Sequence, residues 1–519
     1  MGSAESMTGW RPSNTVPVPV TTLVARADGR LIPAAGADPI DEITVTGAAL
    51  RAHQVRPGDL FAALPGARAH GADFVDQAIA AGAAAVLTDP EGAARPRLTD
   101  AEVPLLVHDD PRGVLGEIAA WIYGEPSLDV AVLGITGTSG KTTTAYLVES
   151  GLRAAGKTTG LIGTVETRVA GERLTSAFTT PEAPDLQALF ALMVERGVTH
   201  VPMEVSSHAL SLGRVNGTRF TVGAFTNLSQ DHLDFHRDMA EYFAAKAQLF
   251  DGRSTTEVVV IDSAWGQTLV TPQTITVALD ASTGAAWTAS DLGSTPTGEQ
   301  SFTLHGPGGV SIRTTLPLPG EFNVVNALLA AAILDVTGVG PDEIATGLSS
   351  VQVPGRMERV DEGQRFTAVV DYAHKPAAVA LGLDALRGQT EGKVITVLGC
   401  GGDRDAGKRA QMGEAAARRS DVLIVTDDNP RSEDPAEIRA AVLSGAKAVA
   451  PEFAGEVVEI GDRKEAIRHA VSLAAPGDSV LIAGKGHETG QNIAGVVHPF
   501  SDRDELAAAL RAAVEGARL

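Results

Sequence analysis

The stretch Gly137–Thr143 reads Gly-Thr-Ser-Gly-Lys-Thr-Thr and lies between an apolar run, Val130–Ile135, and a helical pattern over Ala145–Ala155. A strand, a glycine-rich loop and a helix in this order place backbone N–H groups and a helix N-terminus around a phosphate. In such a loop Lys141 reaches the terminal phosphates, and the hydroxyl of either following threonine holds Mg²⁺. The sequence therefore predicts a phosphate-binding loop, with ATP as its ligand.

The loop departs from the strict Walker pattern, which places a glycine five residues before Gly140. That position is Ile135, and the nearest earlier glycine is Gly134. A glycine-rich turn that binds no phosphate is the alternative interpretation. The strand–loop–helix setting favours phosphate binding.

Composition narrows the class of protein. The chain has 519 residues, 44% of them hydrophobic, a size that predicts about three domains with sizeable cores. Lys and Arg number 42 against 64 Asp and Glu, a net charge of −22 that argues against nucleic acid or an anionic membrane as partner. The single cysteine, Cys400, excludes an internal disulfide and a cysteine-rich zinc site. Neither a long apolar stretch nor a signal-like N-terminus is present, so we expect a soluble, cytoplasmic protein.

Strands alternate with helical patterns over most of the chain, which predicts the α/β class with parallel sheets. We expect three domains: residues 1–127, a small α/β domain whose first 20 or so residues form a loose tail; residues 128–353, a central P-loop ATPase domain with a parallel sheet; and residues 354–519, a Rossmann-like domain. Residues 301–316 alternate around Gly306–Gly309 as in a β-hairpin. Pro354–Arg356 resembles a hinge. The central strands are expected at Val130–Ile135, Gly160–Val165, Val198–Glu204, Val222–Leu228 and Val258–Ile261, and the C-terminal ones at Ala368–Tyr372, Val394–Leu398, Val422–Thr426 and Ser479–Ala483.

Two central strands run into polar clusters, Glu204–His208 and Thr226–Asp234. Ligands of open α/β sheets bind beyond the carboxyl ends of strands, so these clusters are candidates for the metal site. Glu204 offers the hard oxygen that Mg²⁺ prefers, and His232 is a second, less natural ligand. A solvated strand end and a structural histidine are the alternative interpretations.

Four more strand ends carry polar residues in the C-terminal part of the chain: Asp371–His374, Gly399–Asp405, Asp428–Arg431 and Gly484–Glu488. The glycines of the second segment do not complete G-x-G-x-x-G, because Arg404 occupies the last position; an anion contact is the better interpretation. Together the segments suit a zwitterion, with Arg431 on a carboxylate and Asp428 or Glu488 on an ammonium. A surface ion network is the alternative.

Taken together, these segments resemble the Mur ligase family of peptidoglycan enzymes and, within it, the ligases that add diaminopimelate as the third residue of the stem peptide. The resemblance extends from about Ile43 to the end of the chain, and the loop without the first Walker glycine is the family's own form. The motifs occur in family order: Gly137–Thr143, Thr179–Glu182, Met203–His208 with Arg214, Thr226–Asp234, Ala245–Lys246, Leu318–Asn323, Pro354–Arg356, Asp371–His374, Gly399–Arg409, Asp428–Arg431 and Gly484–Glu488.

The resemblance implies an ATP-dependent ligase with UDP-N-acetylmuramoyl-L-alanyl-D-glutamate and diaminopimelate as substrates, acting as a cytoplasmic monomer. On its own, Lys246 would pass for a solvated helix lysine; the resemblance makes it a lysine carboxylated by CO₂ (N6-carboxylysine). It also implies Lys141, Lys246 and His232 as catalytic residues, and two Mg²⁺ ions held by Thr142, Glu204, His232 and Lys246. The implied ATP contacts are Gly137, Thr138, Ser139, Gly140, Lys141, Thr142, Thr143, Asn323, Asn326, Arg356 and Asp371. The muramoyl contacts are Thr179, Thr180, Ser206 and Arg214, and the diaminopimelate contacts are Arg404, Asp428, Asn429, Pro430, Arg431, Gly484 and Glu488.

The chain departs from the family pattern in two places. Many relatives have Asp-Ser-Arg before the Pro-Gly-Asp turn, where this chain has Arg51–Gln54, so the serine contact to uridine is absent. Leu212 stands where a glutamine is common before the substrate arginine. The sequence leaves open whether the meso or the LL isomer of diaminopimelate is used.

Three rival functions compete with this interpretation. A folylpolyglutamate synthase and a lysine-adding ligase belong to the same superfamily, and Arg431 with the segment Gly399–Arg409 argues against both. A P-loop ATPase that ligates nothing leaves Lys246 and the segment Asp428–Arg431 unexplained.

Overall fold

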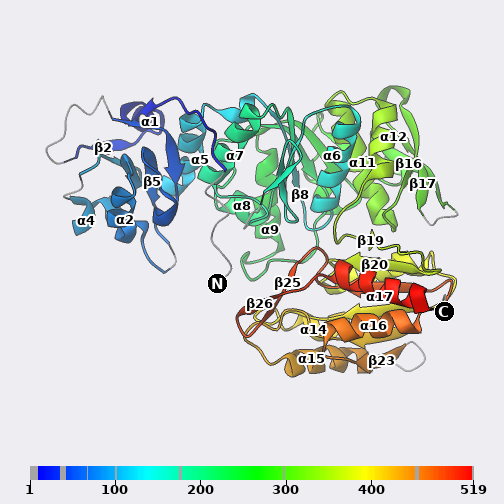
Figure 1. The fold of residues 1–519 in the computed structure, drawn as a ribbon. Helices are drawn as coiled ribbons and strands as arrows, with labels where there is room; N and C mark the ends of the chain where they lie inside the picture. Colours follow the sequence, from blue (N-terminus) through cyan, green and yellow to red (C-terminus); the bar gives the residue numbers. More distant parts are fainter. Residues whose placement is uncertain are drawn as a thin grey trace.

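The computed structural model describes residues 10–34, 43–66, 68–99, 102–174, 178–295, 299–449 and 455–516. Three α/β units follow one another along the chain, built on sheets of five, eight and six strands (Figure 1). The predicted α/β class with a central P-loop sheet and a Rossmann-like C-terminal unit is confirmed. None of the helices in these ranges has the length and apolar character needed to cross a membrane.

The N-terminal unit has a parallel sheet with one antiparallel edge strand, β2. The strand order is β2 (Arg30–Ile32), β7 (Leu105–Val107), β6 (Ala85–Thr88), β5 (Asp59–Ala63) and β4 (Gly47–Ala49), and β1 (Val18–Pro19) pairs with β3 (Thr44–Val45). Its helices are α1 (Val20–Arg26), α2 (Val75–Ala80), α3 (Pro90–Ala93), α4 (Pro96–Thr99) and α5 (Pro111–Ile122).

The loose tail expected over the first 20 residues is wrong for residues 10–20; residues 1–9 lie outside the described ranges. Trp10 is only 4% exposed and packs with Leu189 in the core of the central unit. Arg11 donates to both carboxylate oxygens of Asp59 in the N-terminal sheet. The segment therefore connects two units, because Trp10 is buried in the central unit and Arg11 pairs with Asp59 of the N-terminal unit.

The central sheet is parallel except for its edge strands β10 and β11. Its order is β11 (Glu172–Leu174), β10 (Thr167–Val169), β9 (Gly160–Ile162), β12 (His200–Glu204), β8 (Ala131–Thr136), β13 (Phe220–Phe225), β14 (Ser254–Val260) and β15 (Ile275–Val277). The helices are α6 (Lys141–Ala154), α7 (Ala183–Glu195), α8 (Ser207–Ser211), α9 (Met239–Ala247), α10 (Ala264–Gln267), α11 (Glu321–Val336) and α12 (Pro341–Ser350).

The middle strand β8 shows why this sheet is covered on both faces. Leu133 and Ile135 pack with Leu328 of α11, whereas Val132 points the other way and packs with Leu189 of α7. Alternate side chains of a strand point to opposite faces, so a continuous apolar run requires helices on both sides. The predicted hairpin is confirmed as β17 (Gln300–His305) and β18 (Ser311–Leu316), with β16 (Thr288–Ser294) as an unforeseen third strand.

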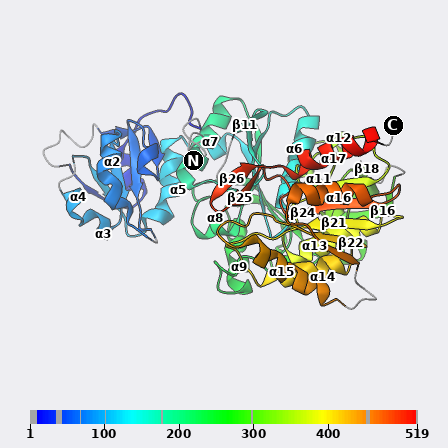
Figure 2. The same ribbon diagram turned by 60° about the horizontal axis from the view of Figure 1, so that its bottom comes forward.

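The C-terminal sheet has the order β19 (Glu358–Arg359), β20 (Thr367–Asp371), β24 (Ser479–Ala483), β21 (Val394–Leu398), β22 (Val422–Val425) and β23 (Glu456–Glu459), with only β19 antiparallel. Helices α13 (Pro376–Arg387), α14 (Lys408–Ala417) and α15 (Pro435–Lys447) cover one face, and α16 (Arg463–Leu473) and α17 (Asp502–Gly516) the other. A hairpin of β25 (Gly490–Ile493) and β26 (Val496–Pro499) lies on the side of α8 and α9 in both ribbon views (Figures 1 and 2).

Candidate functional site

The glycine-rich loop follows β8 and ends where α6 begins, at Lys141. Gly137 and Gly140 have φ of +142° and +87°, which side-chain-bearing residues rarely adopt. A Cβ at Gly137 would overlap the hydroxyl of Thr226, and one at Gly140 would overlap the amide oxygen of Asn326. Both glycines are therefore required by backbone conformation and by close packing.

The loop is held against the chain that follows β13. Thr226 Oγ1 donates to the carbonyl of Ser139 at 2.7 Å, and Asn227 Oδ1 accepts from the N–H of Ser139 at 3.1 Å. The backbone N–H of Thr138 donates to the carbonyl of Asn227 at 2.9 Å. The loop is thus pre-organised by its hydrogen bonds to the cluster that follows β13.

Two lysines meet at one carbonyl of the loop. Lys141 Nζ donates to the carbonyls of Gly137 and Thr138 at 2.9 and 3.0 Å, and Lys246 Nζ donates to that of Gly137 at 2.7 Å. Burial lowers the pKa of Lys141 to about 8. Lys246 is 1% exposed, and burial, reinforced by the charge of Lys141, lowers its pKa well below the usual value. Lys246 is therefore not the solvated lysine that its helix alone suggests.

Thr142 and Glu204 form the oxygen-rich part of the site. Thr142 Oγ1 donates to Glu204 Oε1 at 2.9 Å, and Glu204 is 1% exposed. Thr164 donates to both carboxylate oxygens, through its N–H at 2.8 Å and its hydroxyl at 3.1 Å. Both threonines considered for the metal are buried in α6, and it is Thr142 whose hydroxyl faces the carboxylate of Glu204. A hydroxyl and a buried carboxylate beside a phosphate loop fit the oxygen ligands that Mg²⁺ requires.

His232 lies in a left-handed turn, with φ of +52°. Its Nε2 is 3.1 Å from Asp231 Oδ2, and burial lowers its pKa to about 4. Asp231 also forms an ion pair with Lys375 at the start of the C-terminal unit. The described residues contain no group of three or more His, Cys, Asp or Glu side chains arranged to hold a metal ion. A Mg²⁺ site built on Glu204 and His232 would therefore need further oxygen ligands, such as the hydroxyl of Thr142.

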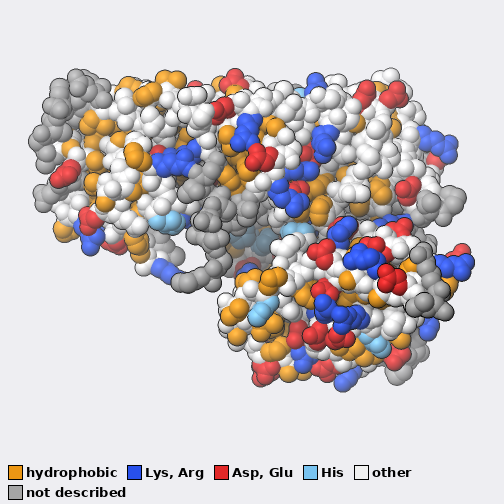
Figure 3. Space-filling model, in the orientation of Figure 1, with side chains coloured by type: hydrophobic (Ala, Val, Ile, Leu, Met, Phe, Trp, Pro, Cys, Tyr) orange, Lys and Arg blue, Asp and Glu red, His pale blue; other side chains and the backbone are white. Residues whose placement is uncertain are grey.

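Further histidines surround His232. The rings of His208 and His232 are 4.8 Å apart, and those of His208 and His236 are 5.7 Å apart. Figure 3 shows histidine side chains at the seam between the central and C-terminal units. Asp231, next to His232, pairs with Lys375 of the C-terminal unit, so this histidine cluster lies beside the boundary between the two units.

Asn323 and Asn326 project from α11 toward the loop. Asn326 Nδ2 donates to Asn323 Oδ1 at 3.1 Å, and Asn323 Nδ2 donates to the carbonyl of Pro319 at 2.7 Å. Asn326 packs against Gly140. Asn326 therefore lies at the loop, and Asn323 lies behind Asn326, farther from the loop.

Arg356 reaches the loop from the C-terminal unit, and Asp371 holds the backbone of the residue that follows Arg356. Arg356 Nη2 donates to Thr142 Oγ1 at 3.3 Å, and its guanidinium lies 4.5 Å from the ring centre of Tyr372. Asp371 accepts from the N–H groups of Met357 and Ala373 at 2.7 and 2.8 Å, and burial raises its pKa. The implied nucleotide contacts thus come from both sides of the seam.

The four implied muramoyl contacts also converge. Thr180 Oγ1 donates to the carbonyl of Glu204 at 2.8 Å and accepts from the N–H of Ser206 at 3.2 Å. Arg214 Nη1 donates to the carbonyl of Thr180 at 3.2 Å. Thr179 Oγ1 lies 3.0 Å from the hydroxyl of Thr164, which holds Glu204. These residues form a polar wall next to the carboxylate of Glu204.

The implied amino-acid contacts gather at the carboxyl ends of β21, β22 and β24. Asn429 Nδ2 donates to Glu488 Oε2 at 2.8 Å, and a Cβ at Gly484, whose φ is +121°, would crowd a carboxylate oxygen of Asp428. Arg431, with φ of +55°, donates from Nη1 to the carbonyl of Gly402 at 2.6 Å. Arg404 and Arg431 both border Gly401, and Pro430 packs against Gly402. The segments therefore form one connected polar cluster and not scattered surface charges.

The sequence analysis does not identify several residues that contact the predicted site residues. Lys485 is fully buried and bonds Asn429 and Glu488, and Lys375 reaches across the seam to Asp231. Each of these lysines lies next to glycine, proline or histidine in a polar segment. Such a pattern does not reveal contacts with residues that are distant in the sequence. The backbone of Asn492 donates to Asn429 Oδ1 at 2.9 Å, a contact made by the unforeseen hairpin.

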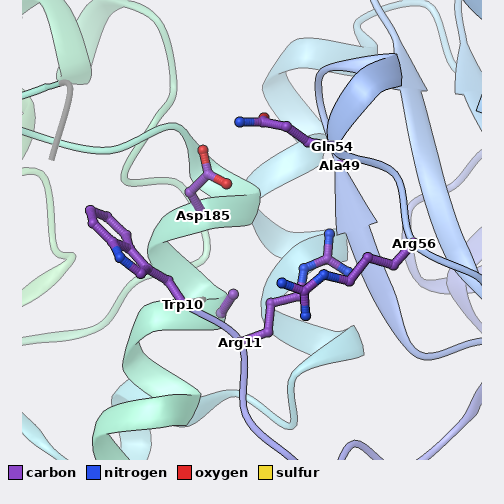
Figure 4. A pocket seen from close by; sticks show the side chains of 7 residues that line it. Trp10, Arg11, Ala49, Gln54, Arg56 and Asp185 are labelled. Carbon is purple, nitrogen blue, oxygen red and sulfur yellow. The ribbon is translucent and has the colours of Figure 1, made fainter. Parts of the chain in front are cut away.

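A small pocket lies where the N-terminal unit meets α7 (Figure 4). Arg11 and Arg56 lie on one side of it and Asp185 on another, and burial raises the pKa of Asp185 to about 6. Gln54, from the segment that departs from Asp-Ser-Arg, also lines it. The altered segment thus faces the boundary with the central unit.

A phosphate loop on a parallel sheet, facing a Rossmann-like unit with its own polar pocket, defines a multi-domain nucleotide-binding α/β protein. Family models match three consecutive segments: "Mur ligase family, catalytic domain" over residues 44–123, "Mur ligase middle domain" over 135–334, and "Mur ligase, glutamate ligase domain" over 355–486.

A protein of Streptomyces coelicolor named UDP-N-acetylmuramoyl-L-alanyl-D-glutamate–2,6-diaminopimelate ligase is 54% identical over 510 residues, covering 97% of this chain and 99% of that protein. One of the same name from Corynebacterium efficiens is 56% identical over 464 residues, 87% of each chain. A solved structure described by the same enzyme name shares 30% identity and a TM-score of 0.69, covering 96% of this chain and 100% of that one. The chain belongs to the Mur ligase family.

Proposed function

We propose that the chain is an ATP-dependent ligase that joins diaminopimelate to the D-glutamate of UDP-N-acetylmuramoyl-L-alanyl-D-glutamate, in the synthesis of peptidoglycan precursors. The observation that carries the proposal is the meeting of two sites at one seam. The phosphate loop with Thr142 and Glu204 belongs to the central unit, and Arg356 of the C-terminal unit bonds Thr142. The identity of 54% to a relative of that name supports the substrate pair.

ATP binds, in this proposal, with its phosphates on Gly137–Thr143 and its adenine near Asn323 or Asn326. Lys141 and the N-terminus of α6 supply positive charge where the phosphates lie. Thr142, Glu204, His232 and Lys246 are the residues that would hold two Mg²⁺ ions. When bound, these ions neutralise the charge that develops as phosphate is transferred.

Lys246 suits carboxylation because burial lowers the pKa of its amine well below the usual value, which favours the neutral form. A neutral amine is the form that reacts with CO₂, and the carbamate would replace an amine with an oxygen ligand. The contact of Lys246 Nζ with the carbonyl of Gly137 supports a ligand position at the phosphate loop.

The remaining residues would orient the two substrates. Thr179, Thr180, Ser206 and Arg214 form the polar wall at which the muramoyl dipeptide ends, next to Glu204. On the other side, Arg404 and Arg431 would contact a carboxylate of diaminopimelate. Asp428, Asn429, Pro430, Gly484 and Glu488 form the rest of that wall, with the two carboxylates facing an ammonium.

The reaction needs an activated carboxylate, because an ionised oxygen is a poor leaving group. The γ-carboxylate of D-glutamate attacks the γ-phosphorus of ATP, ADP leaves, and an acyl phosphate forms. The amine of diaminopimelate then attacks the acyl carbon, phosphate departs, and the amine loses a proton. Lys141 holds the phosphate oxygens during the transfer, and the walls on both sides of the seam bring the amine to the acyl carbon.

Water would hydrolyse the acyl phosphate, so we propose that the C-terminal unit closes over the central one. Pro354–Arg356 is the proposed hinge, with domains at residues 1–127, 128–353 and 354–519. Gly355 has φ of +63° and packs directly against the Gly486–His487 backbone, so the hinge and the amino-acid pocket move together. We further propose that the enzyme acts as a monomer in the cytoplasm, where ATP and nucleotide-linked sugars are available.

The test is phosphate release with ATP, Mg²⁺ and UDP-N-acetylmuramoyl-L-alanyl-D-glutamate, with meso-diaminopimelate, LL-diaminopimelate, L-lysine or no amino acid added. We expect release that requires a diaminopimelate, with a product of the corresponding added mass, and the assay also identifies the isomer. Release that requires L-lysine would indicate the lysine-adding rival. Release without any amino acid and without product would leave only an ATPase.

A further inference from the structure

Lys485 is a buried cation that the proposed mechanism does not use. It follows β24, is 0% exposed, and donates from Nζ to Asn429 Oδ1 at 3.1 Å and Glu488 Oε2 at 3.2 Å. Asp428 Oδ1 lies 3.8 Å from the same nitrogen. A buried charge is costly unless it is paired, so this lysine is held in place by the pocket wall.

Lys485 fixes the orientation of Asn429. The amide oxygen accepts from Lys485 Nζ at 3.1 Å and from the backbone N–H of Asn492 at 2.9 Å. With the oxygen committed to two donors, the amide nitrogen has to point to Glu488, which accepts from it at 2.8 Å. Asn429 therefore presents a hydrogen-bond donor on the side of Glu488.

Lys485 also sets the charge of the wall. Asp428 and Glu488 contribute two negative charges and Lys485 one positive charge, so the three groups together carry one net negative charge. The other buried cation nearby, Arg463, is matched by Asp502 through two hydrogen bonds of 2.7 Å. One negative charge balances one substrate ammonium, and Arg431 on the same wall balances one carboxylate.

We propose that Lys485 is a positioning residue that sets the specificity of this pocket for amino acids whose distal end carries both an ammonium and a carboxylate. Without Lys485 the negative charges of Asp428 and Glu488 are uncompensated and offset the guanidinium groups of Arg404 and Arg431, which weakens binding of a distal carboxylate relative to a distal ammonium. The inference rests on the proposed function, because it needs the pocket to bind the incoming amino acid.

The test is the variant Lys485→Met, assayed with meso-diaminopimelate, the LL isomer and L-lysine. We expect the KM for the preferred diaminopimelate to rise about thirtyfold, the loss typical of a charge-assisted contact, with the KM values for ATP and the muramoyl substrate unchanged. The ratio of kcat/KM for diaminopimelate over L-lysine should fall about tenfold or more, since repulsion acts only on the distal carboxylate. Lys447→Met, at an exposed lysine of the same unit, is the matched control and should leave all values unchanged.

A purely structural lysine would give a different result. Loss of such a lysine would lower the melting temperature and weaken the binding of diaminopimelate and L-lysine equally. An unchanged ratio of the two kcat/KM values in a folded variant therefore overturns the inference. Lys485→Gln keeps a donor for Asn429 while removing the charge, and it decides the question if Lys485→Met does not fold. Failure of the proposed function is distinct, because wild-type enzyme would then consume no diaminopimelate at all.

Discussion

The phosphate loop and the proposed amino-acid pocket lie on different sides of one seam and are built in different ways. The loop is shaped by backbone: two glycines with positive φ, a helix N-terminus, and hydrogen bonds from Thr226 and Asn227. The pocket is shaped by charged side chains, with Lys485 shared between Glu488 and Asp428. A rigid loop suits a phosphate common to many reactions, whereas a balance of charges suits one amino acid. Changes to the loop side should therefore abolish the reaction, and changes to the pocket should alter which amino acid is used.

The largest effect is expected on the loop side, from Lys246→Ala. Ligation should be abolished, because the carbamate ligand proposed at Gly137 is lost, and short carboxylic acids such as acetate should restore part of the rate. The measurement is product formation with and without added acid. Lys157→Ala, at an exposed lysine after α6, is the control that should keep full activity. Full activity of Lys246→Ala would rule out the carbamate.

On the pocket side, Arg431→Ala should raise the KM for diaminopimelate by about thirtyfold, or about 2 kcal/mol, through loss of a charge-assisted pair. The KM for ATP should not change. Alanine tolerates the left-handed backbone at this position no worse than arginine, so folding should be retained. Arg404→Ala, on the other side of Gly401, compares the two guanidinium groups. If the KM for diaminopimelate is unaffected in Arg431→Ala, the distal carboxylate is bound elsewhere.

How far the two regions could be predicted from the sequence follows from the same difference. Glycines, strand ends and apolar runs are local patterns, so the loop between β8 and α6 and the strands of the central sheet could be predicted from the sequence. From its own segment, Lys246 was predicted to be a solvent-exposed lysine on a helix. Its burial could not be predicted, because it depends on the packing of α9 against a loop 109 residues earlier in the chain. Lys485, Lys375 and Trp10 were missed for the same reason: they contact residues that are distant in sequence. The strands of the β25–β26 hairpin have only 4 residues each, too few to show a period. The longer strand β16 has a shift in register between Ser290 and Gly293, which interrupts its alternation.

The next prediction concerns pH and again separates the regions. The pKa of Lys141 is lowered to about 8, so its ammonium is charged below pH 8 and neutral above it. The Kd for ATP should therefore be flat below pH 8 and rise above it, by at most tenfold per pH unit. Titration calorimetry from pH 7 to 9.5 measures this. Lys141→Arg should remove the dependence, since a guanidinium stays charged in that range. The same rise in Lys141→Arg would assign the titration to another group.

The smallest effect is expected at the connection between the two regions. Lys375 of the C-terminal unit pairs with Asp231 beside His232, and both side chains are partly exposed. Partly exposed pairs contribute about 0.2–1 kcal/mol, so Lys375→Ala should shift the balance between closed and open forms about fivefold at most. Solution scattering should show a slightly larger radius of gyration without ligands, and the difference should vanish with an ATP analogue and the muramoyl substrate, which hold the seam together independently. Lys393→Ala, at an exposed lysine before β21, should scatter like the wild type.

Scattering that does not change in Lys375→Ala would mean that the hydrogen bond of Arg356 to Thr142 is sufficient to hold the units together. Scattering of the wild type that does not respond to ligands would instead contradict the hinge at Pro354–Arg356.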